Sequence, residues 1–271
     1  MKKRTIRSQI KGFTLAEMAI VMVLITLLIG GLMSPLTAQR DADARRNTQQ
    51  ALNTAREALF GYAIQHGRLP CPARMDIPTG ATGAGIEATI RGSGDCACTS
   101  SSAASSHGIS GNSGGCNGNT VFGVLPWVTL GLDETDAWNN RYSYLVTAYY
   151  ARTSGIQSNF DCDTVSPEPP PNNAAFALCS KGLGLVRDSS SLNWSPLTTA
   201  NEAPAIVVSH GNNGLGAYGP NGLLLTGAGG DELANSDGDA IFISNTKIDD
   251  LLVWISRPVL MNRMIAAGRL P

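Results

Sequence analysis

Three stretches of the sequence bring together residue types that could carry chemistry, and the first is glycine-rich. Residues Gly214–Gly219 read Gly-Leu-Gly-Ala-Tyr-Gly, the spacing of a dinucleotide-binding loop. Such a loop needs a helix to open at its last glycine, so that backbone amides face the pyrophosphate. Pro220-Asn221-Gly222 follows instead, and no βαβ unit can be drawn. We therefore expect a turn-rich connection with no nucleotide.

The second stretch is an acidic loop near the C-terminus. Five oxygen-bearing side chains crowd into nine positions: Asp231, Glu232, Asn235, Asp237 and Asp239. Calcium takes about six to eight oxygen ligands, and loops of this composition suit it. An EF-hand would need glycine at Ala240 and a carboxylate near Thr246, so the loop is not of that type. It is a candidate calcium site, with a solvated acidic turn as the simpler interpretation. No other cofactor is expected.

The third stretch is Ser209-His210, which could suggest nucleophilic catalysis. The serine does not sit in the pattern of a nucleophile elbow. His66 and Cys71 could suggest thiol chemistry, but Cys71 fits a disulfide better. We expect no enzymatic activity.

The cysteines predict disulfides. All six follow the apolar segment near the N-terminus: Cys71, Cys96, Cys98, Cys116, Cys162 and Cys179. An even number in an exported chain is typical of disulfide bonding, and six cysteines allow 15 pairings, so the connectivity stays open. Zinc fingers use Cys-x2-Cys spacing, whereas Cys96-Ala97-Cys98 is one residue short.

The charge balance argues against a nucleic-acid partner. The 271 residues contain 20 basic and 21 acidic side chains, for a formal charge of −1. Without the five basic residues of positions 1–12, 15 basic residues face 21 acidic ones and the charge is −6. Such a chain has no general attraction for phosphates. A charged fraction of only 15% fits a loop-rich, extracytoplasmic domain that contains β-strands.

The N-terminus has the pattern of a targeting signal. Basic residues precede Gly12, and an uncharged, mostly apolar run extends from Met18 to Met33. A secretory signal is cleaved after its apolar core, whereas the candidate cleavage point here, Gly12, lies before it. Glu17 is the only acidic residue before Asp41. A carboxylate within a membrane-length segment costs several kcal/mol unless it is paired.

This arrangement resembles the N-terminal signal of type IV pilins and pseudopilins. The resemblance rests on the basic leader, Gly12, Phe13-Thr14-Leu15, Glu17 and the apolar run. It implies that a prepilin peptidase cuts between Gly12 and Phe13 and that Phe13 is N-methylated. It also implies that Glu17 pairs with the amine of a neighbouring subunit and so sets the assembly register. Some pseudopilins hold calcium in a C-terminal acidic loop, which favours that site.

A second, weaker resemblance lies in the head. Asp136-Ala137-Trp138 through Tyr142 resembles an Asp-x-Trp-Gly-x-x-Tyr stretch seen in many pilin-like proteins, with Asn139 where glycine often stands.

These features need a long helix and a head to position them. We expect a leader over residues 1–12, a transmembrane or filament-core helix over 13–35, an amphipathic helix over 36–66 and a globular periplasmic or extracellular head over 67–271. Pro35 predicts either a kink or a helix that melts in the filament. Apolar spacing at Thr48, Leu52, Ala55, Leu59 and Tyr62/Ala63 predicts the face that packs on the head. Gly67 should end this helix.

Within the head, the sequence predicts strands and one last helix. Strands are expected at Tyr142–Tyr149, Ala205–Ser209 and Ala240–Ser244. The spacing of apolar residues predicts a helix over Asp249–Ile265 that Pro258 breaks or kinks. The fold class is therefore α+β and pilin-like, with a long N-terminal helix packed on a loop-rich antiparallel head stapled by disulfides.

The expected function is structural, as a minor pilin in a type IV pilus-like filament. The resemblance implies other pilin subunits, the prepilin peptidase and methyltransferase, an inner-membrane assembly platform and, before assembly, membrane lipids as partners. It places the protein at the bacterial inner membrane with a periplasmic head, and then in a filament. Three alternatives stay open: a pseudopilin of a type II secretion system, a filament-borne adhesin or DNA-uptake binder, and an anchored periplasmic enzyme.

Overall fold

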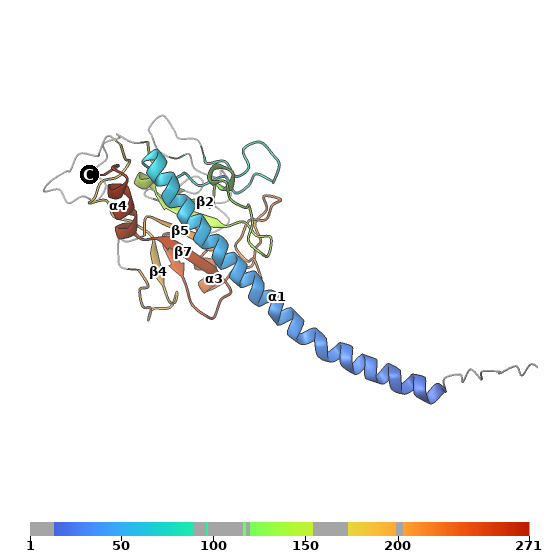
Figure 1. Ribbon diagram of the computed structural model, residues 1–271. Helices are drawn as coiled ribbons and strands as arrows, with labels where there is room; N and C mark the ends of the chain where they lie inside the picture. The colour runs from blue at the N-terminus through green and yellow to red at the C-terminus, as the bar shows by residue number, and fades with distance from the viewer. Residues whose placement is uncertain are drawn as a thin grey trace, which may run out of the picture. The chain divides into compact units, whose positions relative to one another are not determined.

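The computed structural model describes residues 14–88, 96, 116–117, 120–153, 173–198 and 203–270, with the backbone alone for 29–37 and 116–117. The chain divides into two compact units, Met1–Asp43 and Ala44–Pro271. One helix, α1 (Leu15–His66), contributes residues to both (Figure 1).

Helix α1 is uninterrupted from Leu15 to His66. Its 52 residues include Gly30, Gly31 and Pro35, so the helix does not end at the proline. The sequence predicted a membrane-spanning segment over residues 13–35, which the structure does not support: within the described ranges, no helix is both long and apolar enough to cross a bilayer.

In the second unit, the remaining part of α1 packs one face on the head. Thr48, Leu52, Ala55, Leu59 and Ala63 are each at most 2% exposed, which confirms the predicted apolar face. The helix ends at His66 because Gly67 adopts a φ of +71°. A Cβ at Gly67 would lie 2.2 Å from the backbone oxygen of Asn173, so only glycine fits this turn.

A five-stranded antiparallel sheet forms the centre of the head. Its strands are β1 (Cys116–Asn117), β2 (Thr120–Val124), β3 (Ser143–Thr147), β5 (Ala205–Ser209) and β7 (Leu251–Ile255). They lie in the order β1-β2-β3-β5-β7. The α+β fold with an antiparallel sheet is thus as predicted.

Smaller elements surround this sheet. A separate parallel pair consists of β4 (Leu185–Arg187) and β6 (Ile241–Ile243). Short helices are α2 (Trp127–Leu130), η2 (Ala148–Tyr150) and α3 (Asp231–Ala234), and a longer one is α4 (Arg257–Ala266).

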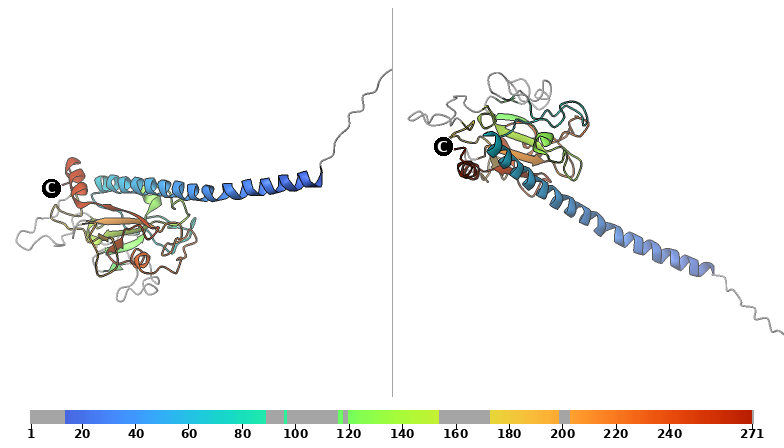
Figure 2. Two further views of the ribbon diagram at one scale, coloured as in Figure 1. Left: turned by 90° about the horizontal axis from the view of Figure 1, so that it is seen from below. Right: turned by 45° about the horizontal axis from the view of Figure 1, so that its top comes forward.

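Alternation along the central strands produces two cores, one on each face of the sheet. Ala205 and Val207 face the core that includes α1 and α4, whereas Ile206 and Val208 face the core that includes β4 and β6. Figure 2 shows the helices α1 and α4 on one side of the sheet and α3 on the other.

Two predicted elements differ from the structure. The predicted last helix, Asp249–Ile265, is wrong in its first half, because Leu251–Ile255 is strand β7 paired with β5. Pro258 does not break a helix but lies in the first turn of α4, where its missing N–H costs nothing. The predicted strand Tyr142–Tyr149 is shorter, since Ala148–Tyr150 turns into a 3-10 helix.

Candidate functional site

The first turn of α1 is closed by a capping box between Thr14 and Glu17. The backbone N–H of Thr14 donates to Glu17 Oε2 at 2.9 Å, and the N–H of Glu17 donates to Thr14 Oγ1 at 3.3 Å. This reciprocal pair satisfies two donors at the helix start that have no partner within the helix. Sequence reasoning missed this role, although the signal was present in the Thr14-x-x-Glu17 spacing.

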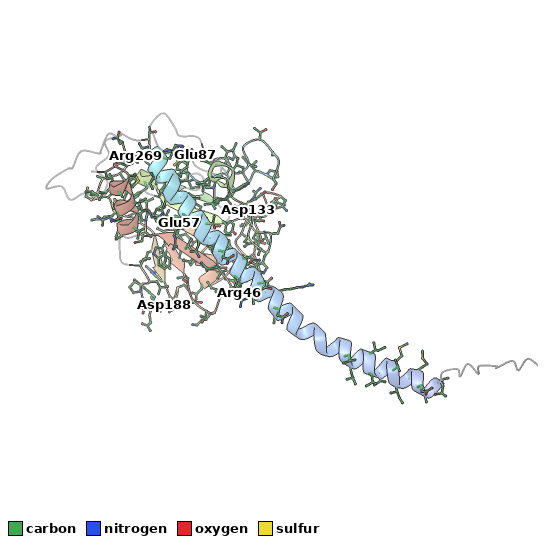
Figure 3. The ribbon with its side chains drawn as sticks, in the orientation of Figure 1. Arg46, Glu57, Glu87, Asp133, Asp188 and Arg269 are labelled. Carbon is green, nitrogen blue, oxygen red and sulfur yellow. A yellow bond between two sulfur atoms is a disulfide. The ribbon has the colours of Figure 1, made fainter. Side chains whose placement is uncertain are left out.

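The apolar residues that follow the capping box are exposed around the helix. Large side chains of residues 15–28 are between 44% and 89% exposed: Leu15, Met18, Ile20, Val21, Met22, Val23, Leu24, Ile25, Leu27 and Leu28. Figure 3 shows some of these side chains pointing away from the helix in several directions. A helix that is apolar all round is stable when other apolar surfaces cover it. In the single chain this apolar surface is uncovered.

The predicted processing site, Gly12 and Phe13, lies outside the described residues. The nearest described residue is Thr14. Cleavage and methylation therefore stay predictions.

Of the six predicted disulfide cysteines, three are seen in disulfide bonds. Cys71 and Cys96 form one bond, 25 residues apart in sequence. Cys179 is also disulfide-bonded. Cys98 and Cys162 lie outside the described residues, as does the side chain of Cys116. The bond links the segment that follows α1 to Cys96, and both of its cysteines are buried.

The candidate calcium residues are used in local hydrogen bonds. Asp231 accepts from the N–H of Ser190 and from Asn245 Nδ2, each at 2.8 Å. Glu232 accepts from Asn213 Nδ2 at 2.6 Å. These bonds tie α3 to three neighbouring loops, so both carboxylates already have partners in the chain.

The other three candidate calcium residues brace the turn before β6. Asn235 is fully buried and donates to Asp250 Oδ2 at 2.7 Å. Asp237 accepts from the N–H of Asp239, and Asp239 from the N–H of Ile241. Burial, together with the neighbouring Asp239, raises the pKa of Asp237 to about 6.

Within the described ranges, no three His, Cys, Asp or Glu side chains are grouped so that they could hold a metal ion. Calcium binding stays a prediction from sequence.

The buried histidine has a different serine partner from the one that sequence suggested. His210 Nε2 lies 2.7 Å from the hydroxyl of Ser143, whereas the hydroxyl of Ser209 donates to Asp136 Oδ2 at 2.6 Å. All these side chains are buried, and burial lowers the pKa of His210 to about 4. A neutral imidazole without solvent access suits a structural hydrogen bond and not catalysis on an external substrate.

The Asp-x-Trp stretch is a braced turn. Asp136 Oδ1 accepts hydrogen bonds from the N–H groups of Trp138 and Asn140, each at 2.9 Å. Asn139 between them has a φ of +68°. Asparagine tolerates this left-handed conformation better than most residues, which explains how it can replace the glycine expected there.

The glycine-rich loop is a turn-rich connection with glycines at positive φ, as predicted. Gly214 and Gly216 both adopt positive φ, and a Cβ at Gly216 would lie 2.4 Å from the Cβ of Ser236. No helix opens after Gly219, since residues 219–222 form a turn closed by the N–H of Gly222 on the carbonyl of Gly219.

Comparison with known proteins identifies the N-terminal segment. Residues 7–33 match the family described as the prokaryotic N-terminal methylation motif. No curated protein and no solved structure matches the chain. The chain therefore carries the type IV pilin and pseudopilin signal, and this signal includes the exposed apolar residues 15–28 of α1.

Proposed function

We propose that this chain is a structural subunit of a type IV pilus-like filament and that it assembles through its N-terminal helix. The observation that carries the proposal is the methylation motif at residues 7–33, which contains the ten exposed large apolar side chains of residues 15–28. A prepilin peptidase would cut between Gly12 and Phe13, and the same maturation step would methylate Phe13.

The driving force for assembly is the burial of this helix. Burial of apolar surface contributes roughly 25 cal/mol per Å², and ten large side chains of residues 15–28 are more than 40% exposed. Equivalent helices of neighbouring subunits would cover them in a filament core. Before assembly, the same side chains would associate with inner-membrane lipids, while the head lies in the periplasm.

Glu17 has two roles in this proposal. In the single chain it completes the capping box with Thr14. Cleavage after Gly12 leaves that box intact and creates a positive amine on Phe13. A carboxylate and an amine attract strongly where water is excluded, so Glu17 would face the amine of a neighbour and fix the register of the added subunit.

The size of the second compact unit favours a minor subunit over a repeated major one. This unit contains 228 residues, from Ala44 to Pro271. The partners would be other pilin subunits and the inner-membrane assembly platform. A pseudopilin of a type II secretion system would have the same N-terminal signal. If deletion of the gene abolished enzyme secretion and left surface fibres intact, the chain would be assigned to that system.

The two roles of Glu17 can be separated by experiment. Glu17→Gln keeps the acceptor for the capping box but removes the charge, whereas Glu17→Ala removes both. We expect both variants to be cleaved. We also expect both to be depleted at least about tenfold from sheared filaments, because neither glutamine nor alanine carries the negative charge that attracts the amine. Immunoblots of membrane and filament fractions measure this. Normal incorporation of Glu17→Gln would contradict the charge pairing.

A further inference from the structure

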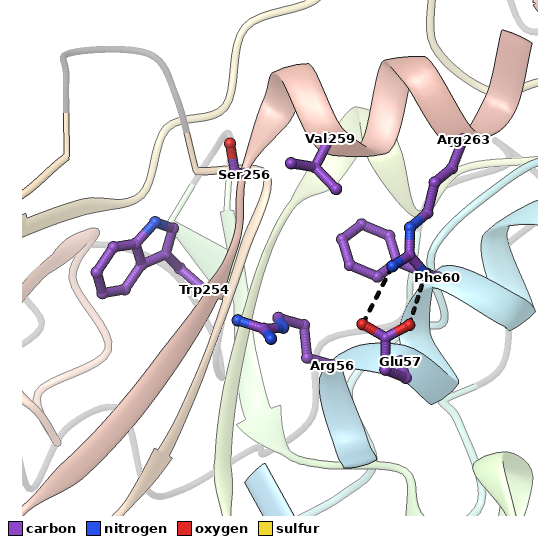
Figure 4. Close-up of a pocket in the computed structure, with 7 residues that line it drawn as sticks. All are labelled: Arg56, Glu57, Phe60, Trp254, Ser256, Val259 and Arg263. Atoms are coloured by element: carbon purple, nitrogen blue, oxygen red, sulfur yellow. Dashed lines mark hydrogen bonds and ion pairs between the residues drawn. The ribbon is translucent and has the colours of Figure 1, made fainter. Parts of the chain in front are cut away.

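A groove on the head lies between α1, β7 and α4. Its volume is about 220 Å³, and its lining residues are Arg56, Glu57, Phe60, Trp254, Ser256, Val259 and Arg263 (Figure 4). All belong to the second compact unit. The groove thus combines three apolar side chains with two cations and one carboxylate.

One of the two cations is fully engaged inside the groove. Arg263 donates to both carboxylate oxygens of Glu57, at 2.6 and 3.2 Å. Its guanidinium carbon also lies 4.2 Å from the centre of the Phe60 ring. This bidentate pair, stacked on an aromatic face, fixes one wall of the groove and neutralises Glu57.

The other cation, Arg56, is not engaged in this way. Among the described residues it makes no hydrogen bond, although its charge is attracted to the nearby Glu57 carboxylate. Figure 4 shows its guanidinium projecting into the groove between Trp254 and Glu57. Because Glu57 is already paired with Arg263, the groove retains one net positive charge beside apolar walls.

We propose that this groove receives an acidic side chain carried on an apolar segment of the adjacent filament subunit. The planar donors of Arg56 match a carboxylate, and the partly exposed side chains of Trp254 and Val259 would cover the apolar neighbours of that carboxylate. A free inorganic anion would leave these two side chains in contact with water. The inference rests on the proposed filament function, because α1 supplies both the apolar assembly residues and three of the groove residues.

Photo-cross-linking in assembled filaments tests this occupant. A benzophenone amino acid replaces Val259, which is 43% exposed and lines the groove. The matched control carries the same probe at Ile265, which is 48% exposed on the same helix but does not line the groove. The full chain is expressed with the complete assembly system, and mass spectrometry identifies the peptide attached to each probe.

We expect the Val259 probe to attach to a filament subunit within a peptide that contains Asp or Glu, and the Ile265 probe not to do so. Adding Arg56→Glu should lower the yield roughly tenfold or more, because like charges would then face each other across the interface. Arg56→Lys should retain most of it. Both variants leave the Arg263–Glu57 pair in place, so the groove wall persists.

Three results would overturn the inference. They are equal yields in Arg56→Glu and the unchanged chain, attachment to a lipid or to a peptide without a carboxylate, and no product in filaments that contain the protein. In each of these cases the filament function would stand. Absence of the cleaved protein from the filament fraction would instead refute the proposed function, and the groove's occupant with it.

Discussion

The guanidinium of Arg269 donates a hydrogen bond from Nε to the backbone oxygen of Ile64, at 2.8 Å. A second N–H of this side chain reaches the carbonyl of Gln65 at 2.6 Å. Because α1 ends at His66, these carbonyls belong to its last turn and lack helical partners. A positive charge there also complements the helix dipole. The C-terminal end of the chain therefore caps the long helix.

Replacing this cap should destabilise the head. Arg269→Gln is expected to lower the free energy of unfolding by about 1–2 kcal/mol, since two hydrogen bonds from a charged group are lost. Urea denaturation of the purified full chain measures it. Arg74→Gln is the control, because its pair with Asp76 is half exposed and should contribute under about 1 kcal/mol. Equal effects of the two changes would contradict the capping role.

Arg141 should be the most sensitive charged residue of the head. Its side chain is fully buried, and it pairs with Glu134 at 2.7 Å and donates to the carbonyls of Ile77 and Pro220. Arg141→Met would leave the partly buried Glu134 carboxylate without its counter-charge and the carbonyls of Met75 and Ile77 without this donor, at a cost of about 3 kcal/mol or more. Arg263→Met, at a pair that is 38% and 52% exposed, should cost far less. Urea titrations compare the two variants, and similar losses would refute this ranking.

Asp250 should make the head less stable as the pH rises. Burial and the nearby carboxylates Asp249 and Glu232 raise its pKa to about 7, and its Oδ1 has no partner among the described residues. The unfolded carboxyl ionises near pH 4. Between about pH 4 and pH 7 the unfolded state therefore gains stability that the folded state does not.

Asp250→Asn removes this cost and can still accept the hydrogen bond from Asn235. The variant is expected to be more stable than the unchanged protein at pH 7, by roughly 2 kcal/mol. The gain should disappear near pH 4. Urea denaturation at pH 4, 5.5 and 7 measures the difference in the free energy of unfolding between the two proteins. Contributions from the ionisable groups that both proteins share cancel in this difference. A difference that does not vary with pH would show that Asp250 is not the responsible group.

The disulfide between Cys71 and Cys96 should contribute substantially to stability. The 25-residue separation of its cysteines corresponds to about 3 kcal/mol in the loop-closure account. The double variant Cys71→Ala/Cys96→Ala should lose about that much, and each single variant should lose no less. Thermal and urea denaturation under non-reducing conditions provide the comparison. A loss below about 1 kcal/mol would mean that the surrounding packing holds this segment without the bond.

Local patterns in the sequence were enough to predict the helix face and one strand. The spacing from Thr48 to Ala63 identified the buried side of α1, since 3.6-residue periodicity depends only on neighbouring turns. Ala205–Ser209 was predicted with the bounds it has in the structure. Its β-branched residues, Ile206, Val207 and Val208, favour a strand wherever it lies.

Long-range pairing explains where the prediction failed. The apolar residues of Leu251–Ile255 fit a helix as well as a strand, and their conformation is decided by pairing with β5, almost fifty residues earlier. The partners of Ser143 and Cys71 likewise lie 67 and 25 residues away, and no local pattern specifies them. The groove at Arg56 was not foreseen because α1, β7 and α4 meet there only in the fold.

The central claim is that this chain is matured as a pilin and built into a filament through its N-terminal helix. N-terminal sequencing and intact mass of the protein recovered from sheared filaments test it most directly. We expect a chain that begins at N-methylated Phe13, with a mass lowered by the six protons of three disulfides. A chain that still begins at Met1 in cells with an active prepilin peptidase, and that stays out of the filament fraction, would contradict the account.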